Sequence, residues 1–208
     1  MLLSHSHKFI FIHIYKTGGM SVKKALQRYD QSYSLLLHLK SFLKKKPVVE
    51  ASIAHKHAKA SDISKLIDKN VFDNYHKFAV VRNPFYWQVS LYHYILRMPP
   101  DVHPHYKIIQ NLKGFDEYVE WRVKTDPVNQ VSFLTIGDDK IVVDRIVKYE
   151  NIDQDFKELC TYLGIKNSTL PHVNATKRKH YREYYNKHTI KMMEDAYGPD
   201  LDSLNYIY

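Results

Sequence analysis

Two short segments of the chain, residues 9–14 and 78–81, are apolar at nearly every position instead of alternating between polar and apolar. This pattern is typical of parallel strands that are buried on both faces. Residues 48–54 and 141–148 are rich in β-branched side chains and are also predicted to be strands. Helical patterns lie between and after these runs, at residues 21–29, 61–68, 84–97, 153–163 and 189–197. Alternating strands and helices predict an α/β fold with a mostly parallel central sheet flanked by helices.

The length and composition fit one globular domain. The chain has 208 residues, of which 44% are hydrophobic and 25% charged, so we expect a single domain over residues 1–208. Cys160 is the only cysteine, which excludes an intrachain disulfide and a zinc site built on two cysteines. This usage favours a reducing compartment, and a cytoplasmic location is expected. No apolar run approaches the ~20 residues of a membrane span, and no signal-peptide pattern opens the chain.

The net charge of the chain is basic. The 31 Lys and Arg residues exceed the 22 Asp and Glu residues by 9. Such a balance favours an anionic ligand, or indicates only a solvated surface. Because the basic residues are spread out and form no nucleic-acid-binding signature, we expect no nucleic-acid partner.

The segment after the first predicted strand has the features of a phosphate-binding turn. In parallel sheets, ligands bind beyond the carboxyl ends of the strands. The six residues there are Lys16, Thr17, Gly18, Gly19, Met20 and Ser21. The glycines allow backbone N–H groups to approach an anion at a helix N-terminus, the lysine supplies charge, and the hydroxyls supply donors. The order differs from a Walker A loop, since the lysine precedes the glycines. The alternative is a flexible surface turn.

Two other strand ends carry polar side chains. Arg82 follows the third predicted strand, and Ser90 lies eight residues later within the helical pattern. An arginine there is suited to grip a phosphate, although a surface arginine and an ordinary helix serine remain the alternative. His55 and His57 follow the second strand, and alternate residues of an extended chain point the same way. Histidine suits proton transfer near neutral pH. A metal site is not expected, and solvated or core histidines remain the alternative.

A basic run near the C-terminus, residues 174–180, contains Thr176 and Arg178. It is either a solvated face or a basic flap over a phosphate.

These motifs together resemble a known family. Residues 9–21 resemble the 5′-phosphosulfate loop of sulfotransferases that use 3′-phosphoadenosine 5′-phosphosulfate (PAPS). Residues 80–85 followed by Ser90 resemble the 3′-phosphate site of the same enzymes. The resemblance is greatest to the carbohydrate-type branch, which includes the heparan and uronyl 2-O-sulfotransferases and small bacterial relatives. It implies a P-loop-like sulfotransferase fold.

The resemblance also implies roles for individual residues. Residues 149–160 resemble the family's late strand–helix unit, and residues 170–178, with Thr176 and Arg178, resemble its nucleotide-closing segment. His55 and His57 match the His-x-His pair of the 2-O branch, which implies a histidine base, and we favour His57. Lys16 would neutralise charge on the leaving group. Tyr15 and Met20 depart from the usual proline and threonine of the loop.

The resemblance therefore predicts transfer of a sulfuryl group from PAPS to an acceptor hydroxyl without a metal. A saccharide is the expected acceptor, and a small phenol or a lipid headgroup is the alternative. It also predicts a soluble chain, since the membrane anchor of the Golgi members is absent from this sequence. Residues 98–137, with Trp121 and Arg122, are expected to bind the acceptor. The alternatives are a P-loop-like small-molecule kinase and a non-catalytic protein that binds anionic glycans or nucleotides. The oligomeric state is not indicated.

Overall fold

The computed structural model describes residues 1–31, 57–100, 102–137, 140–166, 169–171 and 179–208. Contacts group the chain into two compact units, and each is described by itself below. The first comprises Met1–Val81 and Gln130–Asn174, and the second comprises Arg82–Asn129 and Ala175–Tyr208. The expectation of a single domain over residues 1–208 stays a prediction.

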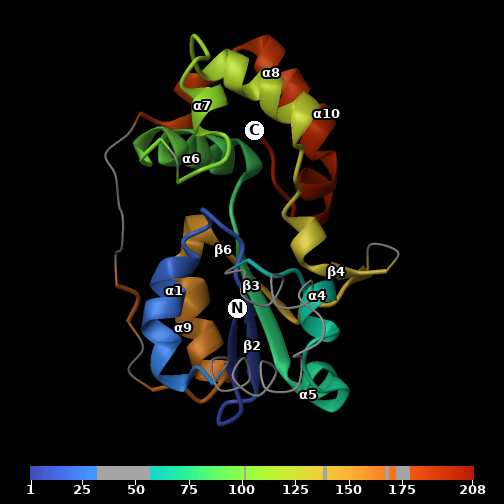
Figure 1. The fold of residues 1–208 in the computed structure, drawn as a ribbon. Coiled ribbons are helices and arrows are strands. Elements are labelled where there is room, and N and C mark those ends of the chain that lie inside the picture. The colour runs from blue at the N-terminus through green and yellow to red at the C-terminus, as the bar shows by residue number, and fades with distance from the viewer. Residues whose placement is uncertain (32–56, 101, 138–139, 167–168, 172–178) are drawn as a thin grey trace. The chain divides into compact units, whose positions relative to one another are not determined.

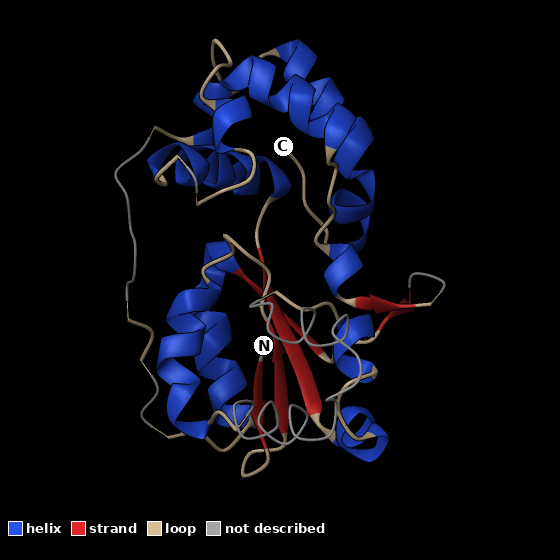
Figure 2. Ribbon diagram, in the orientation of Figure 1, coloured by secondary structure: helices blue, strands red, loops and turns tan. Residues whose placement is uncertain are grey.

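The first unit contains a four-stranded sheet with helices on both sides (Figures 1 and 2). Its elements in chain order are β1 (Leu2–Ser4), β2 (Phe9–Ile12), α1 (Gly19–Leu26), η1 (Gln27–Tyr29), α4 (Ala60–Ser64), α5 (Lys69–Asn74), β3 (His76–Val81), η2 (Val131–Phe133), β4 (Thr135–Ile136), β5 (Lys140–Ile141), β6 (Arg145–Lys148), η3 (Tyr149–Asn151) and α9 (Ile152–Tyr162). The sheet order is β1-β2-β3-β6, in which β1 is antiparallel to β2 and the other pairs are parallel. The predicted α/β fold with a mostly parallel sheet is confirmed.

Strands β2 and β3 are buried on both faces, as their uniform apolarity predicts. On one face, aromatic rings of these strands pack beneath α1 and α9. That core contains Phe9, Phe11, Phe78, Val80, Val147, Val22, Leu26, Phe156 and Leu159. Figure 1 shows α1 and α9 on this side of the sheet and α4 and α5 on the other. The alternate residues Ile10 and Ile12 point to the opposite face and are also fully buried.

The register of the sheet brings three strand ends to one edge. Ile12 pairs with Ala79, and Val81 pairs with Lys148. Because β2, β3 and β6 are parallel, the segments that follow them all leave the sheet at this carboxyl edge. The Lys16–Ser21 loop follows β2, and η3 follows β6.

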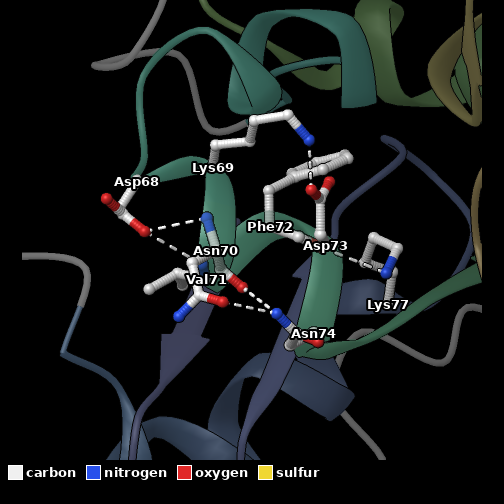
Figure 3. A network of polar contacts seen from close by, with 8 residues as sticks. All are labelled: Asp68, Lys69, Asn70, Val71, Phe72, Asp73, Asn74 and Lys77. Atoms are coloured by element: carbon white, nitrogen blue, oxygen red, sulfur yellow. Dashed lines mark hydrogen bonds and ion pairs between the residues drawn. The ribbon is translucent and has the colours of Figure 1, made fainter.

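The predicted helix over residues 61–68 is wrong in its extent, because α4 ends at Ser64 and Asp68 caps a second helix, α5. The carboxylate of Asp68 accepts hydrogen bonds from the backbone N–H groups of Asn70 (2.8 Å) and Val71 (3.2 Å), which caps α5 (Figure 3). At the other end of α5, Lys77 Nζ donates to the carbonyl of Phe72 (3.2 Å). These bonds join the end of α5 to the start of β3.

The predicted strand over residues 141–148 is divided in two. Ile141 ends β5, which pairs with β4 in a separate antiparallel hairpin, whereas Arg145–Lys148 forms β6. Asp144 lies between them, and its carboxylate accepts from the backbone N–H of Lys77 (2.7 Å). This contact fixes where β6 begins. The predicted strand over residues 48–54 lies outside the described residues.

The second unit is helical in its described part. Its elements are α6 (Pro84–Arg97), α7 (Tyr106–Ile109), α8 (Phe115–Thr125), η4 (Tyr181–Tyr184) and α10 (Lys187–Ser203). Helix α6 has the predicted bounds, with Pro84 in its first turn. Helix α10 continues past the predicted end at residue 197, because a kink at Tyr197 accommodates Pro199. Among the described residues, no helix is both long enough and apolar enough to cross a membrane.

Candidate active site

The loop after β2 turns sharply into α1. Lys16 has a positive φ of 62° and Gly18 a positive φ of 85°, so the chain reverses through two left-handed positions before α1 begins at Gly19. Glycine adopts this conformation without strain, whereas lysine does so at a cost. The first N–H groups of a helix have no partner within the helix, and Gly18 has no side chain to cap them. The turn therefore directs backbone donors and a positive dipole away from the helix.

Both glycines of the loop are in close contact with neighbouring side chains. A Cβ atom on Gly18 would lie 2.7 Å from Cδ2 of Tyr149, which belongs to η3. A Cβ atom on Gly19 would overlap the ring of His13 and would lie 3.2 Å from Cζ of Phe11. The two glycines of the loop are therefore packed onto side chains at the ends of β2 and β6.

Gly19→Ala is expected to lower the free energy of unfolding by roughly 1–3 kcal/mol, the usual cost of overpacking a core. The added methyl group meets the ring of His13, which is only 3% exposed and has little room to move. Gly198→Ala is the matched control, because no heavy atom lies within 4 Å of its Cβ position. Urea unfolding of the two variants measures the difference, and equal stabilities would contradict this account of the loop.

The two hydroxyl residues of the loop differ in what they offer a ligand. Thr17 is fully buried, and its hydroxyl donates to the carbonyl of Ile14 (2.9 Å). Since a hydroxyl has one proton and this one is bonded to Ile14, the backbone N–H of Thr17 is the group that can donate to an anion in this conformation. Ser21 donates its backbone N–H to the carbonyl of Gly18 (3.0 Å), so its side chain is the donor that remains.

His57 lies beside the start of this loop. Its Nδ1 lies 2.9 Å from the backbone oxygen of His13, and its ring centroid lies 4.6 Å from that of His13. The ring also meets the edge of Tyr15, with centroids 5.7 Å apart. The structure therefore brings together His57 and the segment that leads into Lys16, although 44 residues separate His57 from His13.

Sequence reasoning missed the contribution of His13 and Tyr15 to this site. His13 was counted within an apolar strand, and Tyr15 only as a departure from a family pattern. Both rings contact His57, and His13 also fills the space beside Gly19. The sequence does contain one indication, because His13 is a polar ring near the carboxyl end of the apolar run 9–14. Binding residues of parallel sheets lie at this end of the strands.

Arg82 and Ser90 belong to the second unit, where Arg82 lies two residues before α6 and Ser90 lies within that helix. Arg82 is the residue after the last residue of β3 in the chain, and both side chains are 5% exposed. The guanidinium of Arg82 lies over the ring of Tyr86, with Cζ 3.6 Å from the ring centroid. Because residues four apart share a helix face, Tyr86 and Ser90 lie on one face of α6.

The expected acceptor residues Trp121 and Arg122 lie on α8 of the second unit. Arg122 is 3% exposed and forms an ion pair with Asp126, one turn later. This pairing is typical of a residue that stabilises the end of its own helix. Trp121 meets the edge of His105, with ring centroids 5.0 Å apart.

Three predicted site residues, His55, Thr176 and Arg178, lie outside the described residues. Within the described ranges, no group of three or more His, Cys, Asp or Glu side chains is arranged to hold a metal ion.

Comparison with known proteins identifies the family. The model of the Sulfotransferase family matches residues 1–206. An uncharacterized protein of Archaeoglobus fulgidus is 24% identical over 117 residues, which cover 56% of this chain and 91% of that protein. The family match includes the loop, His57, Arg82 and Ser90, and the family's reaction is a group transfer. Because the match runs through both compact units, the chain is a transferase that belongs to the sulfotransferase family.

Proposed function

We propose that this protein transfers the sulfuryl group of PAPS to a hydroxyl group of a saccharide, with His57 as the general base. The acceptor oxygen forms a new bond to sulfur while the bond from sulfur to the 5′-phosphate oxygen breaks. The hydroxyl proton passes to His57, and 3′-phosphoadenosine 5′-phosphate leaves. Such in-line transfer depends on positioning and charge stabilisation.

The observation that carries the proposal is the hydrogen bond between His57 and the carbonyl of His13, 2.9 Å long. A carbonyl oxygen only accepts hydrogen bonds, so Nδ1 carries the proton of the neutral ring and Nε2 carries the lone pair. A backbone partner at Nδ1 also fixes the orientation of the ring. These features support His57 as a base whose Nε2 takes a proton from the acceptor.

The proposed role of the loop is to hold the 5′ end of the donor. Backbone N–H groups from Thr17 to Met20 would bind the 5′-phosphate, with the hydroxyl of Ser21 as a further donor. Lys16 would neutralise the charge that grows on the bridging oxygen as sulfur departs. The compact turn at Gly18 and Gly19 supports this role, because it directs unpaired helix donors to one place.

Arg82 and Ser90 are proposed to bind the 3′-phosphate and so to select PAPS over simpler nucleotides. Both residues are buried, which supports an anion-binding site and disfavours the alternative of two ordinary surface side chains. Thr176 and Arg178 would close over the nucleotide, and His55 would assist His57; these roles rest on the family resemblance.

Side chains near His57 support a saccharide as acceptor. The ring of Tyr15 contacts those of His57 and Phe133, with centroid distances of 5.7 and 5.9 Å. Lys59 follows in the same segment as His57, and its Nζ lies 5.5 Å from the centroid of Phe133. Aromatic rings beside a cation suit a sugar that carries an acidic group.

Incubation with radiolabelled PAPS tests the proposed reaction. Glycans with and without uronic acids, simple phenols and lipid extracts serve as acceptors, and ATP labelled in its γ-phosphate serves as the competing donor. We expect label from PAPS in a glycan and none from ATP. Transfer from ATP would establish a kinase instead, and tight nucleotide binding without transfer to any acceptor would favour a binding protein.

Arg82→Ala is expected to weaken the binding of 3′-phosphoadenosine 5′-phosphate by about 1.5–3 kcal/mol. This is the scale of a hydrogen bond to a charged group. Adenosine 5′-phosphate has no 3′-phosphate, so its affinity should hardly change. Arg97→Ala is the matched control, because Arg97 lies exposed in the last turn of the same helix. Calorimetric titration measures the affinity for both ligands. Equal loss of affinity for the two would refute the assignment of Arg82 to the 3′-phosphate.

A further inference from the structure

An aromatic stack extends from Arg82 within the second unit. The guanidinium of Arg82 lies over the ring of Tyr86, at 3.6 Å from Cζ to the centroid. The ring of Tyr86 is in turn stacked on that of Tyr181, with centroids 5.6 Å apart and planes 20° apart. Three side chains from two distant parts of the chain thus form one column, of which Arg82 is the end.

We propose that Tyr86 and Tyr181 are positioning residues that orient the guanidinium of Arg82 toward the 3′-phosphate. The inference rests on the proposed function, since it assigns Arg82 to that phosphate. When a planar guanidinium stacks on an aromatic ring, its N–H groups point outward, parallel to the plane of the ring. In that direction they can donate hydrogen bonds to an anion. Arg82 has several rotatable bonds, so fixing its plane before the ligand arrives lowers the entropy lost on binding.

Tyr181 is also in contact with residues 182 and 208. Arg182 Nη2 donates to the backbone oxygen of Tyr208 (2.7 Å), and the hydroxyl of Tyr208 donates to the carbonyl of Arg182 (3.1 Å). The ring of Tyr208 meets the edge of Tyr181, with centroids 6.0 Å apart. These reciprocal contacts limit the movement of Tyr181 away from Tyr86.

The turn that carries Arg82 is anchored to the same segment. The side-chain oxygen of Asn83 accepts from the backbone N–H of Phe85 (3.0 Å), which caps α6. The side-chain nitrogen of Asn83 donates to the carbonyl of Ile207 (2.8 Å). One asparagine thus fixes the start of the helix and joins it to residues 207–208.

A buried tyrosine completes this anchoring. The hydroxyl of Tyr185 donates to the carbonyl of Phe85 (2.9 Å), and burial raises the pKa of Tyr185 well above its usual value, so the group stays protonated. Phe85 also packs edge-on against Tyr208, with centroids 4.8 Å apart. These hydrogen bonds of the backbone near Arg82 do not involve the rings of Tyr86 and Tyr181, so removing a ring of the stack should free the guanidinium without unfolding the turn.

The test compares two ligands that differ only in the 3′-phosphate. Calorimetric titrations of 3′-phosphoadenosine 5′-phosphate and adenosine 5′-phosphate are made with wild type, Tyr86→Ala, Tyr86→Phe and Tyr181→Ala. For Tyr86→Ala we expect about 3- to 30-fold weaker binding of the bisphosphate, and less than about 2-fold change for the monophosphate. Tyr86→Phe keeps the ring and should bind both ligands as wild type does. Tyr181→Ala should give a smaller loss in the same direction.

Two reference variants make the outcomes separable. Tyr106→Ala removes a ring from α7 and should leave the ratio of the two affinities unchanged. Arg82→Ala measures the full contribution of the guanidinium. If Arg82→Ala leaves this ratio unchanged, the proposed 3′-phosphate site is wrong and the inference falls with it. If Arg82→Ala reduces the ratio but Tyr86→Ala does not, the inference alone is overturned.

The conservative variant separates stacking from simple packing. A loss in Tyr86→Phe as large as that in Tyr86→Ala would overturn the role of the ring. Should Tyr86→Ala fail to fold, as thermal unfolding would reveal, Tyr86→Leu retains apolar volume without an aromatic face and is titrated in its place. A wild-type affinity ratio in Tyr86→Leu would also overturn the proposal.

Discussion

His57→Ala is expected to slow sulfuryl transfer by about 10²- to 10⁴-fold, the usual contribution of a general base. The affinity for 3′-phosphoadenosine 5′-phosphate should remain within about 2-fold of wild type, because a base contacts the acceptor hydroxyl and not the nucleotide. The hydrogen bond that is lost joins the side chain to the backbone of His13, so the loop keeps its own glycine contacts. Single-turnover rates with PAPS and a working acceptor measure the loss.

The control for this variant is His188→Ala, because His188 lies exposed on α10 of the second unit. It should transfer at the wild-type rate. Transfer by His57→Ala at the wild-type rate would make the assignment wrong, and His55 would become the first residue to examine. A loss of nucleotide affinity equal to the loss of rate would mean that His57 maintains the donor site and does not act on the acceptor.

Lys16→Ala should lower both turnover and donor affinity. A lysine on the bridging oxygen contacts the donor in the ground state and more strongly in the transition state, when that oxygen gains charge. Removal of one such donor costs about 10²–10³ in turnover. The affinity for PAPS should fall by about 1.5–3 kcal/mol, as for other charged hydrogen bonds. Steady-state kinetics and calorimetry measure the two effects separately.

Backbone strain does not complicate the interpretation of Lys16→Ala. Lys16 has a positive φ of 62°, and alanine meets nearly the same cost there as lysine, since both have a Cβ atom. Lys24→Ala removes an exposed lysine from α1 and serves as the control for a general loss of positive charge. Lys16→Arg should recover part of the donor affinity. An unchanged turnover in Lys16→Ala would exclude Lys16 from the reaction.

Some features of this protein depend only on neighbouring residues in the chain. Uniform apolarity predicted the two central strands, because strands covered on both faces have no polar side to present. Pro84 and the apolar pattern after it predicted the full extent of α6, and Gly18-Gly19 predicted a turn into a helix. Helix propensity, capping and turn formation depend on a few neighbouring residues, so they can be predicted from the sequence.

Other features required the tertiary structure, because the partners lie far apart in the chain. Residues 141–148 were divided because Asp144 bonds Lys77, 67 positions earlier. The Thr17 hydroxyl faces inward to Ile14, which no sequence pattern indicates.

The same holds for the two sites. His57 owes its orientation to the carbonyl of His13. The ring of Tyr86, over which Arg82 lies, is stacked on Tyr181, in a segment that follows some hundred residues later. The residue types that we propose to carry the chemistry could be identified from the sequence. Their orientation and proton placement were decided by packing, since side-chain contacts between distant segments exist only once the chain has folded.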